Sequence, residues 1–141
     1  MRLLLACLVF LLTAACSNDE TRIELVVDAD VSHAVTVDLV VIEDNQLAQQ
    51  LLSTQAPDWF ANKSAYMMMG GVKVSSYQLV PLSSVSDAVF PPLKSATDKR
   101  LIVVSGSDGS VVFEADDGLV QVVVGAETIS TRETSCLDNA S

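Results

Sequence analysis

Short segments in which apolar and polar residues alternate set the strongest limit on the fold of this chain. Residues 23–27 and 35–42 place Ile, Leu or Val at every second position. Successive side chains of a β-strand point to opposite faces of a sheet, so this period of two predicts two strands, each with a buried face. The second segment is more polar near its start and apolar on both faces near its end. The loop between them, residues 29–34, is compatible with an antiparallel pair.

One block of the sequence follows a helical period instead. Residues 45–52 carry apolar side chains at helical spacing, and Asn45 is the expected N-cap. Pro57 ends this helix and can occupy the first turn of a second helix, predicted over residues 58–69 and stopped by two glycines. Trp59 is expected to anchor the second helix to the sheet. The three methionines at its end cannot all face one side, so at least one is expected to be exposed.

Strand patterns return after the helical block and continue to the end of the domain. Residues 72–79 change parity half-way, which predicts a bulge or break at Ser75-Ser76. Residues 82–99 are rich in Ser and Pro and are predicted to be a long irregular connection, a common setting for a binding loop. The last strands are expected at 101–104, 111–113, 120–124 and 128–134, with turns at Ser107-Asp108-Gly109 and Asp116-Asp117-Gly118.

These elements predict a mainly β protein. About seven short strands with one helical insertion after the second favour a two-sheet antiparallel β-sandwich. Parallel βαβ order is disfavoured, because only one helical block occurs. The expected sandwich domain covers residues 22–134, with the helical insertion at about 45–69 and a flexible tail at 135–141.

The N-terminal segment has the features of a secretory leader that ends at a lipid-attachment cysteine. Arg2 supplies the positive charge, and residues 3–12 form an apolar run too short for a bilayer-spanning helix, which needs about 20 residues. Small residues precede Cys16, which predicts that residues 1–15 are removed and that Cys16 is acylated with a palmitate-type lipid, leaving 16–21 as a tether. Ser17, where inner-membrane retention would place Asp, favours the periplasmic face of the outer membrane. An ordinary leader cut near Ala15 and a buried N-terminal helix are the alternatives.

The charge and the cysteine content of the chain limit the kinds of partner that it can bind. The chain has 8 basic and 18 acidic side chains and a net charge of −10 at pH 7. This acidity argues against nucleic acid and against direct adsorption to anionic lipid, and it favours a basic partner. If Cys7 leaves with the leader and Cys16 is acylated, Cys136 has no partner within the chain. Cys136 is then either a free thiol or a site for an intermolecular bond.

The sequence contains no residue pattern that is typical of a catalytic site. His33 is the single histidine, and it lacks the further ligands that a zinc site needs. Ser107 reads better as a turn residue than as an activated nucleophile. Asp28 with Asp30, and Asp116 with Asp117, lack the ligand density of a calcium loop. We therefore expect a non-catalytic protein with no metal and no cofactor, although spacing alone leaves open a hydrolase with paired carboxylates.

Residues 35–81 contain the segments VTVDLVVIEDNQLAQQL, PDWFANKSAYM and SSYQLVP. Together with the leader, these segments resemble the TssJ family of outer-membrane lipoproteins of type VI secretion systems. The resemblance implies a transthyretin-like two-sheet sandwich with extra helices. It also implies a partner, the periplasmic domain of a TssM-like inner-membrane component, which the family contacts through a long loop between its first two strands. That loop is short in this chain, and the family's aromatic-basic pair in a late strand is absent near residues 100–104.

The resemblance implies that the partner is bound either by the short first loop or by the connection after residue 81. The candidate partner-binding residues are Asp30, Val31, Ser32, His33, Val89 and Phe90. Another class of function stays open beside this one, a small periplasmic binding lipoprotein that inhibits a hydrolase or acts as a pilotin-like chaperone.

Overall fold

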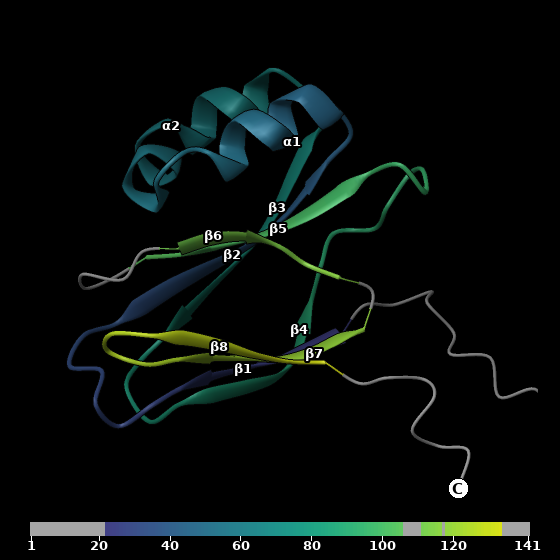
Figure 1. Ribbon diagram of the computed structural model, residues 1–141. Coiled ribbons are helices and arrows are strands. Elements are labelled where there is room, and N and C mark those ends of the chain that lie inside the picture. The colour runs from purple at the N-terminus through teal and green to yellow at the C-terminus, as the bar shows by residue number, and fades with distance from the viewer. Residues whose placement is uncertain (1–21, 106–110, 117, 134–141) are drawn as a thin grey trace, which may run out of the picture.

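Two four-stranded sheets face each other, and two helices cover the outer face of one of them (Figure 1). The computed structural model describes residues 22–105, 111–116 and 118–133. One sheet has the strand order β4-β1-β7-β8 and the other has the order β3-β2-β5-β6. The predicted mainly β, two-sheet sandwich with a helical insertion after the second strand is therefore confirmed. The elements are β1 (Arg22–Val27), β2 (Val35–Ile42), α1 (Asn45–Leu52), α2 (Ala56–Met68), β3 (Val72–Leu79), β4 (Ser84–Val89), β5 (Lys99–Val104), β6 (Val111–Glu114), β7 (Leu119–Val124) and β8 (Ile129–Glu133).

Strand β2 is apolar on both faces because it is covered on both. Val37 and Leu39 point into the core between the sheets, whereas Val40 and Ile42 point to the opposite face and pack under the helices. All four side chains are fully buried. The sandwich therefore has two apolar layers, one between the sheets and one between a sheet and the helices (Figure 1).

Strand β3 has no bulge, so the break predicted at Ser75-Ser76 is wrong. The strand pairs with β2 without interruption from Val72, opposite Ile42, to Leu79, opposite Val35. Its parity changes because its two ends are buried on different faces. Val72 packs under the helices, and Leu79 packs between the sheets.

Residues 82–99 contain a strand, so the long irregular connection predicted there is also wrong. Strand β4 forms the edge of its sheet and pairs with β1 alone. Within the strand only Ala88 is buried. A short edge strand with a polar surface carries almost no apolar periodicity, which explains why its sequence resembles a loop.

The first two strands do not pair, although the short loop between them is compatible with such a pair. β1 and β2 lie in different sheets, and residues 28–34 cross from one sheet to the other. The turn at Asp116 likewise joins β6 and β7 across the two sheets. β1 pairs with β7 in parallel, with Glu24 opposite Gln121, whereas every other strand pair in the described residues is antiparallel. The prediction of a wholly antiparallel sandwich is corrected at this pair.

The helical insertion follows its predicted limits, with a shift of one residue at the first cap. Asp44, not Asn45, is the N-cap of α1, and its side chain accepts hydrogen bonds from the backbone N–H groups of Gln46 and Leu47. Pro57 lies in the first turn of α2. The helix ends before Gly70 and Gly71, whose φ angles of +81° and +74° favour glycine.

Several predictions fall on residues that the structure does not describe. These are the leader, acylation of Cys16, the tether at 16–21, the turn at 107–109 and Cys136 in the C-terminal tail. In the described part of the chain, no helix is long and apolar enough to cross a membrane.

Candidate functional site at the loop end of the sandwich

Three connections meet where β1 ends, and we call this surface the loop end: residues 28–34, 80–83 and 125–128. Val27 N–H donates to the carbonyl of Ser83 (3.0 Å), and Asp28 N–H donates to that of Val124 (2.9 Å). The third connection is closed by Gly125 N–H, which donates to the carbonyl of Thr128 (2.8 Å). Backbone hydrogen bonds therefore hold the connections at the end of the β4-β1-β7-β8 sheet, where the strands terminate. Loops held by a rigid scaffold in this way suit a binding surface.

The turn at residues 80–83 carries an unusual backbone conformation. Ser83 N–H donates to the Val80 carbonyl (3.1 Å), Pro81 occupies the second position, and Leu82 has a φ of +62°. A positive φ at the third position marks a type II turn, which normally has glycine there. A bulky residue in this region is strained by about 1–2 kcal/mol.

The strained leucine is also exposed. Leu82 is 78% exposed and Val80 is 60% exposed, so neither side chain gains much from packing inside the domain. Residues held in sparsely populated backbone conformations cluster at active sites, ligand clamps and switch regions. A contact with a partner outside the domain is therefore the best physical explanation for the positive φ and the exposure of Leu82.

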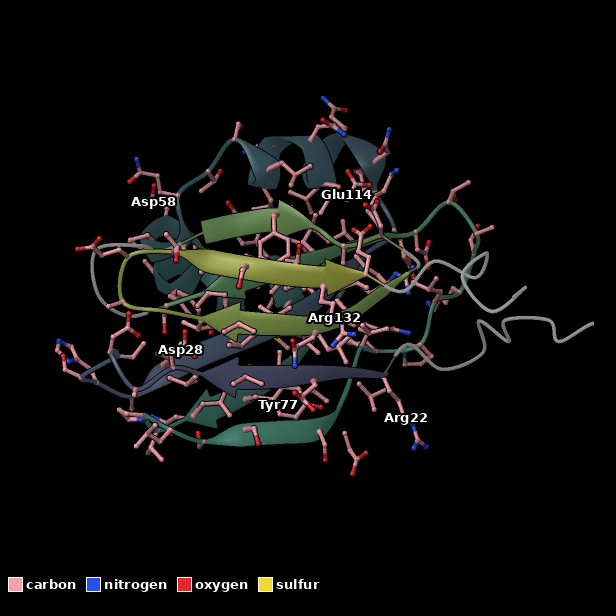
Figure 2. All side chains as sticks on the ribbon, turned by 60° about the horizontal axis from the view of Figure 1, so that its bottom comes forward. Arg22, Asp28, Asp58, Tyr77, Glu114 and Arg132 are labelled. Atoms are coloured by element: carbon pink, nitrogen blue, oxygen red, sulfur yellow. The ribbon has the colours of Figure 1, made fainter. Side chains whose placement is uncertain are left out.

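The charge around this turn has one sign. Asp28, Asp30 and Glu127 are exposed on the neighbouring connections. Among the described residues, no Lys or Arg lies on the three connections. Figure 2 shows Asp28 at one end of the sandwich and Arg22 at the other. An apolar tip beside acidic side chains fits a partner with an apolar pocket and a basic rim.

The structure divides the predicted partner-binding residues. Asp30, Ser32 and His33 are exposed at the loop end, and the Ser32 hydroxyl lies within hydrogen-bond distance of His33 Nδ1. Val31 is only 4% exposed and closes the core beneath the loop. Its side chain is therefore not available to a partner, which corrects the prediction at this position.

Val89 and Phe90 do not join the loop end. Val89 pairs with Arg22 at the start of β1, whereas residues 28–34 follow the end of that strand. Phe90 is 5% exposed and lies under the Arg100 guanidinium, whose Cζ is 5.8 Å from the ring centroid. These two candidates therefore lie on a different surface from the first loop, and the buried Phe90 side chain is not available to a partner.

A second cluster of polar side chains lies between α2 and the sheet. Asp38 is fully buried, and its carboxylate accepts hydrogen bonds from Trp59 Nε1 (2.9 Å), Lys63 Nζ (3.0 Å) and Ser76 Oγ (2.6 Å). Lys63 also donates to Ser76 Oγ (3.0 Å), and Trp59 stacks on Tyr66. Every donor of this cluster is directed at Asp38 or its neighbour, so the cluster fastens α2 to β2 and β3.

Sequence reasoning missed both Leu82 and the Asp38 cluster. The pattern Pro81-Leu82 holds a usable signal, because a type II turn with proline at its second position leaves the next residue at positive φ. Asp38 points to the same face of β2 as Val40 and Ile42, so its burial under a helix could have been predicted from the pattern of this strand. In the described ranges, no three His, Cys, Asp or Glu side chains are grouped closely enough to hold a metal ion.

Comparison of the chain with protein-family models, with curated proteins and with solved structures finds no match. The functional argument therefore depends on the sequence and on the geometry of the described residues.

Proposed function

We propose that this chain is a non-catalytic lipoprotein, anchored through Cys16 at the periplasmic face of the outer membrane, whose loop end binds a periplasmic protein. One observation carries the binding role: Leu82 is held at positive φ and is 78% exposed beside acidic connections. The leader sequence and Cys16 support the anchoring role. Lipid attachment raises the effective concentration of the loop end near the membrane, so a small interface suffices.

The more specific form of the proposal is an accessory component of a type VI secretion system. In this form the partner is the periplasmic domain of a TssM-like inner-membrane protein. Its support is the sequence resemblance over residues 35–81, together with a two-sheet body that carries helices after the second strand. The contact passes through the turn at 80–83, because the first loop is short and its one large apolar side chain, Val31, is buried.

The acidic loop end favours a second candidate, a lipoprotein that binds and inhibits a basic hydrolase. Exposed apolar side chains surrounded by acidic residues fit the mouth of a cationic active site as well as a structural partner. The identity of the captured protein separates the two candidates.

The test combines anchoring and capture in the native host. Mass spectrometry should find an acylated Cys16, and Cys16→Ser should move the protein from the membrane fraction to the soluble periplasm. A photo-crosslinking amino acid at Leu82 should capture one partner that the same amino acid at Gln49, exposed on α1 outside the loop end, does not capture. A secretion component supports the first candidate, and a hydrolase supports the second.

A binding measurement gives the energetic test. Removing a central apolar contact of this size costs about 1.5–3 kcal/mol, so Leu82→Ser should weaken binding of the captured partner by about tenfold or more. Gln49→Ser, on the exposed face of α1, is the control and should bind normally. Equal affinity of the two variants would refute the loop end as the binding surface.

A further inference from the structure

The second exposed apolar surface lies where α2 ends and consists of Met67, Met68, Met69 and Leu93; we call it the methionine surface. Met68 is 88% exposed and Met69 is 73% exposed, while Met67 and Leu93 are each 43% exposed. The sequence predicts that at least one of these methionines is exposed, and the structure exposes all three. Three consecutive exposed thioethers are a poor fit to a helix end that serves only the core.

Leu93 is brought to the methionines through Glu43. Lys94 Nζ lies 3.1 Å from Glu43 Oε1, and the Glu43 N–H donates to the carbonyl of Gly71 (2.9 Å), two residues after Met69. The loop before β5 and the end of α2 are therefore both tied to Glu43, which places Leu93 and the methionines at the same end of the helix-covered sheet.

The methionine surface lies at the end of the domain where β1 begins. In the helix-covered sheet, the start of β3, the end of β2 and the start of β5 lie together at this end. Val72 pairs with Ile42, and Ile42 pairs with Lys99. The chain then passes from the end of β6, opposite Leu101, to Leu119 in the other sheet, where β7 starts alongside the first residues of β1. Figure 1 shows the start of β1 and the exit from α2 on the same side of the molecule, opposite the loop at residues 28–34.

We propose that the methionine surface docks on the phospholipid bilayer to which Cys16 is attached. This inference rests on the proposed lipid anchoring, and it assigns a contact that the anchor alone does not need. Only six peptide units separate Cys16 from Arg22, so the start of β1 stays within about 20 Å of the membrane surface. A surface of exposed apolar side chains held at that distance has the bilayer interface as its nearest apolar phase.

The charges around the methionine surface indicate that docking is apolar and not electrostatic. Lys94 is paired with Glu43, and Lys99 lies 3.1 Å from Glu114. Basic groups neutralised in this way give little attraction to anionic headgroups. Lys73 and Arg22 also lie at this end, but the chain carries a net charge of −10 at pH 7, so docking should depend mainly on apolar contact and should persist at high salt. Because the methionine surface and the loop end lie at opposite ends, docking directs Leu82 away from the membrane and toward the periplasm.

Fluorescence quenching by lipid tests the proposal. The mature chain, residues 16–141 with Cys136→Ser, is coupled through Cys16 to a maleimide lipid in vesicles of phosphatidylethanolamine and phosphatidylglycerol. Chemical coupling makes the result independent of natural acylation, which is tested separately by mass spectrometry. Leu93→Trp reports on the methionine surface and Leu82→Trp reports on the loop end, while the native Trp59 is buried and supplies a common background.

Lipids brominated near the headgroup should quench Leu93→Trp strongly and Leu82→Trp weakly. Adding Met68→Ser and Met69→Ser to Leu93→Trp should lower the ratio of docked to undocked protein by about tenfold, equivalent to about 1.4 kcal/mol. Circular dichroism and the urea midpoint check that these exposed substitutions leave the fold intact.

Three results would overturn the proposal. Equal quenching of the two reporters would mean that the domain has no preferred orientation. Loss of quenching at high salt would replace apolar docking by electrostatic adsorption. Shielding of Leu93→Trp that appears without vesicles and grows with protein concentration would identify a second copy of the chain as the occupant.

Discussion

Replacing Leu82 by glycine should make the domain more stable while abolishing its proposed function. Glycine relieves the strain of about 1–2 kcal/mol that a leucine side chain experiences at positive φ. It also increases the entropy of the unfolded chain, which offsets about 0.4–1 kcal/mol of that gain. Little packing is lost, because Leu82 is 78% exposed. The net effect on the free energy of unfolding should be a gain of about 0.5–1 kcal/mol.

Urea denaturation of the soluble mature chain, with Cys16→Ser, measures this gain. With an m-value of about 1–3 kcal/mol per molar urea, the midpoint should rise by roughly 0.2–1 M at unchanged slope. Leu82→Ala keeps the strain and should leave the midpoint almost unchanged. Leu82→Asn should give an intermediate rise, because asparagine tolerates this region better than leucine. A Leu82→Gly protein less stable than the parent would refute the assignment of strain to this turn, and normal partner capture by it would refute the role of the side chain.

Three further substitutions probe the fold around the two ends. Gly125→Ala should lower the free energy of unfolding by about 1–3 kcal/mol in urea titrations, because the new Cβ would lie 3.0 Å from the Thr128 carbonyl oxygen; an unchanged midpoint would mean that this turn adjusts freely. Asp38→Ala should cost about 2–4 kcal/mol, since it removes the acceptor of three hydrogen bonds under α2; a loss below 1 kcal/mol would mean that the cluster does not fasten the helix. Val31→Ala should cost about 1–2 kcal/mol and should also speed amide exchange in residues 28–34, whereas uniform protection would show that Val31 does not hold this loop.

The strands with apolar periodicity were predictable, including three edge strands, and β4 was the strand that was missed. β2 and β5 carry strong apolar patterns because both lie centrally in the helix-covered sheet. β4 was not predicted, because an edge strand that buries only Ala88 has no apolar periodicity in its sequence. The parity change in β3 was visible, but its cause is a change of the buried face along one strand, which depends on where the helices end.

The candidate site was predictable only in part for a similar reason. The sequence directed attention to residues 29–34, and three polar residues of that loop are exposed at the loop end. It also suggested Phe90, whose burial depends on a contact with Arg100 from another strand. Leu82 became a candidate through its φ angle and its exposure, and exposure is set by tertiary packing that a local pattern does not contain.

The parallel pairing of β1 with β7 has a consequence for the order in which the domain assembles. Gln121 Nε2 donates to Glu24 Oε1 across 97 positions of sequence, at 2.6 Å. During synthesis, β1 emerges first but lacks one of its two neighbours until nearly the whole chain has followed. Closing so long a loop slows folding and disfavours completion of this sheet before the chain has been released. A domain of this topology therefore remains unfolded for longer during synthesis, which would suit the export to the periplasm proposed above.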